Sequence, residues 1–258
     1  MIPISIIKMY MKAKLTDNDT CKNCKLEAEK RFEWISEPLA LWHVGEEFLE
    51  DNLRVVFVGK PHRGEPWTPD EDSRYEGKNQ LVKTNSSTYG IAENCATWLF
   101  HTGKGPYWRY TKEITAGLFG NEETAWDKIA MSNLIKCTVS NKEDKTTESM
   151  KQKCVNELGI IWKELQLIGA KNVIIYSGPS YDHVISDDLM RKFWDVERID
   201  EKTDNKHRIP VGRKNCLWWD REIILKSGEM LRILRVSHPE RMRKNDYVKN
   251  ISDWLSNG

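Results

Sequence analysis

Four of the six cysteines are spaced in a way that suits metal binding. Cys21 and Cys24 form a Cys-x2-Cys pair, and Cys137 and Cys154 form a Cys-x16-Cys pair. Together they supply four thiolates, the number that holds a four-iron, four-sulfur cluster or a tetrahedral zinc ion. Zinc ribbons usually have two tight pairs, so the wide second pair favours the cluster. Burial of Cys137 and Cys154 in an apolar core is the alternative, because free cysteine packs well inside proteins.

Reduced thiols are expected because the sequence shows no export signal. The apolar opening, Met1 to Met11, is interrupted by Lys8 and lacks a small-residue cleavage site, and no run of about 18 apolar residues occurs. We therefore expect a soluble, monomeric, cytoplasmic protein with no membrane partner. In that compartment metal ligation explains the cysteines better than disulfides do. Cys95 and Cys216 have no partner at a matching spacing and are expected to be core or incidental residues.

Charge is spread unevenly along the chain, although the net charge is only +1. Residues 14–51 hold ten acidic and five basic side chains, whereas residues 202–249 hold thirteen basic and six acidic ones, a local excess of +7. A phosphate backbone attracts such a basic segment, and the attraction weakens steeply with salt. A basic face that is merely solvated explains the same count equally well.

The elements that would position these residues are predicted by apolar patterns. Short apolar runs at 53–58, 129–135, 172–176 and 230–236 predict four strands, and 222–226 can add a strand through the Ser227-Gly228 turn. Apolar residues spaced by three and four over 148–168 predict an amphipathic helix, and Pro239 opens a last helix through about Leu255. The polar stretches 65–85 and 200–214 predict long loops.

This order of elements predicts the α/β class. A strand, a long helix and a strand make a right-handed parallel crossover. We expect a three-layer α/β/α fold around a central, mostly parallel four-stranded sheet, with ligand-binding loops at the carboxyl ends of the strands. The chain is expected to be one domain, 1–258, with an N-terminal cluster-binding appendage at 1–50 and the α/β/α core at 51–258.

Five motifs occur in an order that resembles the iron-sulfur branch of the uracil-DNA glycosylase superfamily. They are residues 55–61, 132–137, Cys154, 172–178 and 237–239. In that branch a Cys-x2-Cys precedes a Gly-rich first motif, a strand ending in Asn-x-x-Lys-Cys, a helix with the fourth cysteine, and a His-Pro motif. The resemblance, from Cys21 to about Arg243, implies a DNA glycosylase. It also implies a 4Fe-4S cluster, in preference to zinc, on Cys21, Cys24, Cys137 and Cys154.

The resemblance implies roles for individual residues. Asn133 matches the asparagine that reads the polar edge of the flipped base, and His238 matches the histidine that hydrogen-bonds the leaving base. A turn-capping asparagine and a helix-capping segment are the structural alternatives. Tyr89 stands where the family stacks an aromatic ring on the base. The residues around and after His-Pro would contact DNA, with an apolar wedge between phosphate-binding cations: Ser237, Arg241, Met242, Arg243 and Lys244.

The first motif departs from the family. The base-binding segment Gly59-Lys60-Pro61-His62 is one residue shorter than the usual Gly-x-x-Pro and lacks the carboxylate or amide that positions water in some members. Glu65 is the candidate substitute, and His62 leaves open how large a base fits. Lys60 raises the possibility of a Schiff base at the sugar, although a phosphate or structural contact is the simpler reading.

Three functions remain open from the sequence. The first is hydrolysis of the N-glycosidic bond of uracil or a modified pyrimidine, which leaves an abasic site. The second is an antiphage glycosylase that excises a bulky modified cytosine, such as glucosylated hydroxymethylcytosine, from phage DNA; the altered first motif and the long loops favour it. The third is a non-catalytic iron-sulfur module that binds DNA, which the missing carboxylate supports and the intact His238 opposes.

Overall fold

The structure is a computed structural model that describes most of the chain. The described residues are 10–11, 15, 17–32, 35, 38, 41–60, 97, 100–137, 139, 146–204, 207–212, 214–240 and 242–257. The loop expected at 65–85 lies outside them. No helix in the described part of the chain is long and apolar enough to span a membrane.

The chain divides into two compact units, each assembled from three segments. The first unit consists of Met1–His43, Gly59–Leu99 and Met131–Leu167. The second consists of Val44–Val58, Phe100–Ala130 and Ile168–Gly258. The expected single domain, with an appendage at 1–50 and a core at 51–258, stays a prediction.

The described strands form one mixed sheet of eight strands, so the α/β class is confirmed and the expected count of four strands is wrong. The order is β1-β3-β2-β4-β8-β7-β5, and β6 pairs with β7. β2, β4 and β8 run parallel, whereas β7 is antiparallel to β8, and β5 and β6 are antiparallel to β7. The strands are β1 His43–Val44, β2 Val55–Gly59, β3 Ile129–Asn133, β4 Asn172–Ile175, β5 Val196–Glu201, β6 Arg208–Val211, β7 Lys214–Leu225 and β8 Met230–Val236.

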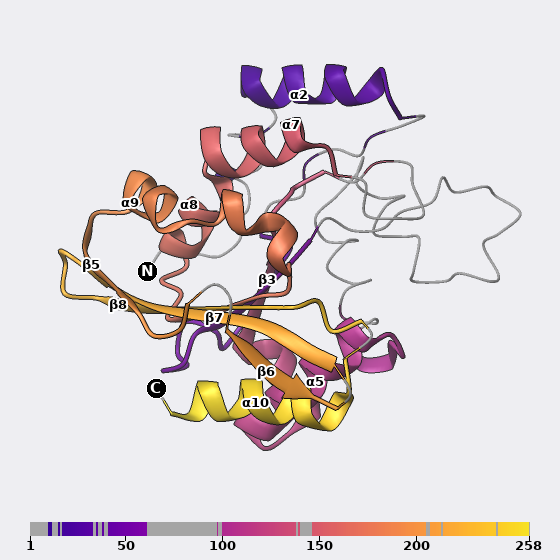
Figure 1. The fold of residues 1–258 in the computed structure, drawn as a ribbon, viewed down its shortest axis with the longest axis vertical. Helices are drawn as coiled ribbons and strands as arrows, with labels where there is room; N and C mark the ends of the chain where they lie inside the picture. The colour runs from indigo at the N-terminus through magenta and orange to yellow at the C-terminus, as the bar shows by residue number, and fades with distance from the viewer. Residues whose placement is uncertain are drawn as a thin grey trace, which may run out of the picture. The chain divides into compact units, whose positions relative to one another are not determined.

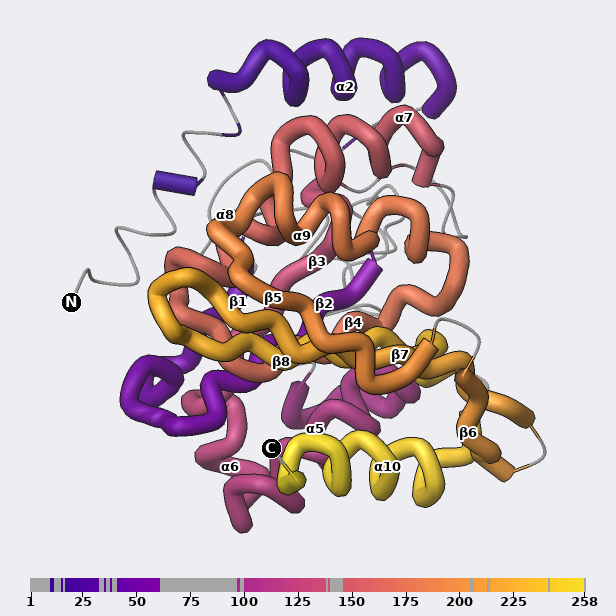
Figure 2. The backbone as a smooth tube through the Cα atoms, turned by 60° about the vertical axis from the view of Figure 1, so that its left-hand side comes forward, coloured from indigo at the N-terminus to yellow at the C-terminus, as the bar shows by residue number. Residues whose placement is uncertain are grey.

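Helices lie on both faces of the strands of the second unit (Figure 1). Helices α5 and α10 are on one face and α9 is on the other, an arrangement that Figure 2 also shows. Helix α5 starts with Pro106 and ends at Gly120, whose φ of 73° is left-handed, the usual sequence signals for a helix start and stop. The helical segments of this unit are α5 Pro106–Phe119, α6 Glu122–Ala125, the 3-10 turns Trp126–Lys128 and η5 Pro179–Val184, α9 Asp187–Phe193 and α10 Lys244–Ser256.

The helix predicted over 148–168 in the first unit is interrupted. It consists of α7 Glu148–Lys151, a π-helical segment Gln152–Glu157 and α8 Ile160–Leu167. Gly159, with a φ of 60°, takes the left-handed backbone that breaks the helix. Helix α2, Asp19–Glu29, lies along α7 in Figures 1 and 2. Glu27 joins them, because it accepts a hydrogen bond from Ser149 Oγ at 2.8 Å and pairs with Lys153 Nζ at 2.6 Å.

Two other boundaries differ from the sequence predictions. The loop expected at 200–214 contains the end of β5 and all of β6, which turns into β7 at Gly212 with a φ of 63°. Edge strands often carry polar and charged residues, so the composition of β5 and β6 resembles that of a loop. The last helix begins at Lys244 rather than Pro239. The pairing of β7 with β8 through the Ser227-Gly228 turn is confirmed, although β7 is longer than expected.

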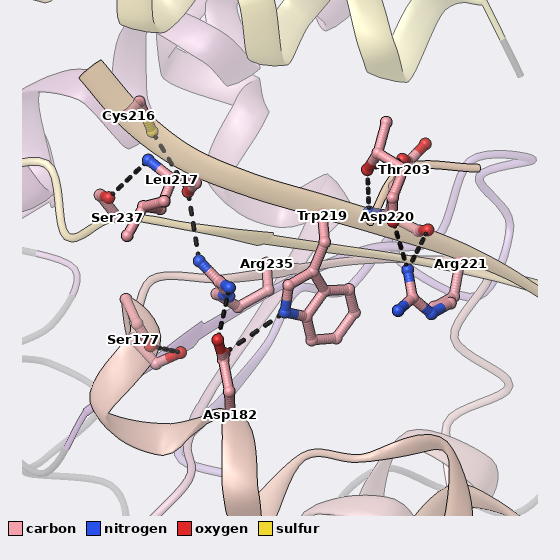
Figure 3. A network of polar contacts seen from close by, with 11 residues as sticks. Ser177, Asp182, Thr203, Cys216, Leu217, Trp219, Asp220, Arg221, Arg235 and Ser237 are labelled. Carbon is pink, nitrogen blue, oxygen red and sulfur yellow. Dashed lines mark hydrogen bonds and ion pairs between the residues drawn. The ribbon is translucent and has the colours of Figure 1, made fainter. Parts of the chain in front are cut away.

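Buried charge ties β8 to the loop that follows β4. Arg235 on β8 has a fully buried side chain, and its Nη2 donates to Asp182 Oδ2 on η5 at 2.6 Å. Asp182 also accepts a hydrogen bond from Trp219 Nε1 at 3.3 Å, and the guanidinium of Arg221 lies 4.9 Å from the centre of the Trp219 ring. Figure 3 shows this network, which joins β7 and β8 to the segment that follows β4.

We predict that Asp182→Asn lowers the free energy of unfolding by about 2 to 3 kcal/mol, because it leaves the Arg235 charge buried without a carboxylate. The value is at the low end for a buried pair, since the Asp182 side chain keeps 23% exposure. Asp195→Asn is the matched control, because the Asp195–Lys226 pair is mostly exposed and should matter little. Urea unfolding measures both variants; equal losses would contradict the prediction.

Candidate functional site

Three of the four predicted cysteine ligands lie on two neighbouring helical segments of the first unit (Figure 1). Cys21 and Cys24 lie on α2, and Cys154 lies in the π-helical segment. Burial, chiefly, raises the pKa of the Cys154 thiol to about 12, and the nearby thiols of Cys21 and Cys24 add to the rise. Lys136 opposes it through its charge. The thiols of Cys21 and Cys24 are thus near enough to influence Cys154, although the segments that carry them are far apart in sequence.

The fourth predicted ligand, Cys137, is half-buried just beyond β3. None of the five cysteines that the structure describes is in a disulfide. Within the described ranges, no group of three or more His, Cys, Asp or Glu side chains is arranged to hold a single metal ion. Thiolate donors of this type suit iron-sulfur chemistry, and the cluster stays a prediction.

A buried ion pair adjoins the cysteines. Lys136 Nζ lies 2.6 Å from Glu164 Oε2, and the two side chains are 1% and 0% exposed. The ammonium also donates to Ser132 Oγ at 2.7 Å and to the backbone carbonyl of Asn133. The backbone N–H of Lys136 is hydrogen-bonded to the Cys154 thiol. Burial raises the pKa of the Glu164 carboxyl, and Lys136 works against that rise.

Two of the predicted base-binding residues, Gly59 and Asn133, lie near each other in the first unit. Asn133 is buried at the carboxyl end of β3, and the backbone N–H of the next residue, Leu134, donates to the carbonyl of Gly59 at 2.9 Å. Gly59 therefore lies beside the Asn133 end of β3. Lys60 follows it and is half-buried. Pro61, His62, Glu65 and Tyr89 lie outside the described residues.

His238 follows the carboxyl end of β8 in the second unit, and its side chain is 30% exposed. Its Nδ1 accepts a hydrogen bond from the backbone N–H of Glu240 at 3.3 Å. The same Nδ1 lies 4.0 Å from Glu240 Oε2, so Glu240 meets this nitrogen with both its backbone N–H and its carboxylate. These contacts hold the Nδ1 edge of the imidazole against Glu240.

A tyrosine that sequence reasoning missed lies beside His238. The rings of Tyr107 and His238 are nearly parallel, at 17°, with their centres 6.3 Å apart. The Tyr107 hydroxyl is buried and has no hydrogen-bond partner among the described residues. Burial raises the pKa of Tyr107, with Tyr176 contributing, so the hydroxyl stays a neutral donor. It follows Gly105-Pro106 at the start of α5, a position that by itself carries no functional signal.

The residues predicted to contact DNA differ in how free they are to do so. Ser237 Oγ accepts a hydrogen bond from the backbone N–H of Leu217 at 3.0 Å, so that hydroxyl already serves the fold. The Met242 carbonyl accepts from Tyr110 Oη at 2.8 Å, and Lys244 Nζ pairs with Glu113 at 2.9 Å. Arg243 is the most exposed of these, at 67% of its side chain. Arg241 lies outside the described residues.

The basic segment presents fewer cations than its sequence suggests. Arg221, Arg232 and Arg235 are 7% exposed or less, and each is hydrogen-bonded within the second unit. Arg232 also lies over the Trp254 ring, 4.1 Å from its centre. The excess of +7 therefore overstates the charge available to a polyanion.

We predict that Lys136→Met lowers the free energy of unfolding by about 3 to 5 kcal/mol, because Glu164 is left buried without its cation. Because burial raises the pKa of Glu164, the carboxyl takes up a proton more readily at low pH, and the loss should grow as pH rises. The double variant Lys136→Met/Glu164→Leu should recover most of the loss. Denaturant unfolding at two pH values measures this; a double variant as unstable as the single one would contradict it.

Comparison with models of known protein families and with curated proteins finds no match for this chain. The resemblance to the uracil-DNA glycosylase superfamily therefore rests on the order of the sequence motifs and stays a prediction.

Proposed function

We propose that this protein is a monomeric, cytoplasmic DNA glycosylase with a three-layer α/β/α core, which hydrolyses the N-glycosidic bond of uracil or a modified pyrimidine. The observation that carries the proposal is His238. It follows the carboxyl end of a strand in the parallel part of the sheet, its Nδ1 accepts a backbone N–H, and its ring is partly exposed. Loops at this end of parallel strands are where ligands of α/β folds bind.

The chemistry needs a donor of this kind. A base stacked in a duplex is inaccessible, so the nucleotide must first leave the stack at a cost of a few kcal/mol. As the glycosidic bond breaks, positive charge develops on the sugar and negative charge on the base oxygen. A preorganised Nε2–H of His238 stabilises that oxygen more in the transition state than in the bound substrate, which is what accelerates the step.

Asn133 supplies the selectivity in this proposal. A side-chain amide presents both donors and an acceptor, and it can therefore match the polar edge of a pyrimidine. Its burial supports the role, because a buried polar group that loses its match discriminates strongly against the wrong base. The missing carboxylate of the first motif fits a dissociative reaction, in which a well-developed oxocarbenium ion captures water readily.

The proposed cofactor is a four-iron, four-sulfur cluster on Cys21, Cys24, Cys137 and Cys154. When bound, such a cluster can cross-link the segments that carry its ligands and can exchange an electron. The gathered thiols of Cys21, Cys24 and Cys154 support this choice. The cation of Lys136 nearby would offset part of the negative charge of the four thiolates.

A second candidate substrate is a bulky modified cytosine of phage DNA. The altered first motif, in which Lys60 directly follows Gly59, is the observation that favours it. Excision of either base would use His238 as the hydrogen-bond donor and would break the same N-glycosidic bond. They differ in the size of the base that is accepted, so a panel of oligonucleotides that carry uracil, hypoxanthine or modified cytosines separates them.

We predict that His238→Ala slows bond cleavage about a hundredfold to a thousandfold and leaves DNA binding nearly intact, because it removes a donor to charge that develops only in the transition state. Asn133→Asp should instead change which base is accepted, because the carboxylate can only accept hydrogen bonds. Single-turnover cleavage beside binding to a non-cleavable analogue measures both. His207→Ala, an exposed histidine, is the control. A full single-turnover rate in His238→Ala would refute the assignment.

We predict that anaerobically purified protein is brown, with absorbance at roughly 400 nm, and contains iron and sulfide. Cys154→Ser should lose most of the iron, whereas Cys216→Ser, which changes a buried cysteine of the second unit, should keep it. Metal and sulfide analysis of the purified variants tests this. Stoichiometric zinc without iron or sulfide in the wild-type protein would overturn the cluster assignment.

A further inference from the structure

We infer that the buried pair Lys136–Glu164 is a positioning device that links the cysteine group to the backbone of Asn133, so that ligation at the cysteines and base selection are coupled. The part that concerns base selection rests on the proposed function. The link itself is a statement about contacts within the first unit.

Lys136 contacts both ends of the link. Its backbone N–H is hydrogen-bonded to the Cys154 thiol, and its ammonium donates to the carbonyl of Asn133. The residue that follows it is the predicted ligand Cys137. A single residue therefore meets one predicted ligand through its backbone, adjoins a second, and holds the base-reading residue through its side chain.

The ammonium has no spare donor with which to move elsewhere. Its three N–H groups match three acceptors: Glu164 Oε2, Ser132 Oγ and the Asn133 carbonyl. Ser132 Oγ in turn donates to Glu164 Oε2 at 2.6 Å. Ser132 and Asn133 are the last two residues of β3, and Glu164 lies on α8. The network thus clamps the end of β3 to a helix.

Stability alone does not account for this network. A buried ion pair contributes little net stability compared with well-packed apolar side chains, because both charges lose their hydration. What such a pair supplies is direction, because all three donors of the Lys136 ammonium are used and hold it in one arrangement. Here the direction is imposed on the carbonyl of Asn133, the residue whose orientation the proposed base reading requires.

Cys154, at the other end of the link, lies in a segment of rare backbone conformation. Cys154 is in the π-helical segment Gln152–Glu157, and π-helical turns occur frequently at functional sites. A change of ligation or of side chain at Cys154 alters the acceptor of the Lys136 N–H. Because Lys136 also holds Asn133, we expect that change to reach the end of β3.

Hydrogen exchange in the full-length protein tests the link without substrate. Cys154→Ser and Glu164→Gln should each raise amide exchange at residues 133–137 roughly tenfold, as expected when one hydrogen bond of a local network is lost. Lys136→Met should do the same where it folds. Asp182→Asn, which weakens a buried pair of the second unit, is the control and should leave these amides unchanged. Unchanged exchange at 133–137 in Cys154→Ser and Glu164→Gln, or an equal rise in Asp182→Asn, would overturn the inference.

Base preference tests the consequence. Glu164→Gln should shift the ratio of excision rates between two substrates in the same direction as Asn133→Asp, with overall DNA affinity kept. A purely structural role would lower all rates together and leave that ratio unchanged, which would overturn the coupling to base selection. Absence of excision by the wild-type protein would refute the proposed function, and the exchange result would still decide whether the link exists.

Discussion

Parallel pairing of β4 with β2 and β8 is the constraint on which the candidate donor depends. Ile175 on β4 is in register with Val58 on β2 and with Arg235 on β8, so these strands end at one edge of the sheet. The loops beyond β4 and β8 are tied at once, because Gly178 N–H donates to the Val236 carbonyl at 3.0 Å. The His238 loop therefore starts from a fixed point, which is what preorganised hydrogen-bond donation requires.

In each unit a buried ion pair fixes the position of a further segment. In the second unit Arg235 and Asp182 join β8 to the segment after β4, and in the first Lys136 and Glu164 hold the end of β3. Each cation is thereby removed from the surface. The basic segment 202–249 therefore exposes fewer cations than its sequence count implies, and Arg243 is among those that stay exposed.

The sequence predicted the apolar strands well and the polar elements poorly. The bounds of β8 and the start of β4 agree with the expected runs, because buried strands are rich in apolar residues, although β8 also carries Arg232 and Arg235. Strand β6 was missed because an edge strand can be polar. The π-helical segment was missed because its residues keep spacings of three and four, and Gly159 was the one signal of a break.

In the candidate site, too, local sequence patterns indicated some residues and missed others. The cysteine spacing predicts a shared ligand set that stays a prediction, whereas Tyr107 and the partners of Lys136 depend on contacts across the fold that no local pattern encodes. A tyrosine or a lysine at a helix start or a strand end is ordinary by itself. Tyr107 is distinguished by a buried hydroxyl that has no hydrogen-bond partner among the described residues. Lys136 is distinguished by a buried ammonium whose donors are all used.

Release of a free base is the most direct measurement of the central claim. The wild-type protein, incubated with oligonucleotides that carry uracil or modified cytosines, should release the intact base, detected by mass spectrometry, and leave an equal amount of alkali-labile abasic sites in the DNA. Tight binding to the same oligonucleotides with neither product, in a preparation that keeps its iron and sulfide, would contradict the account and identify a DNA-binding module without glycosylase activity.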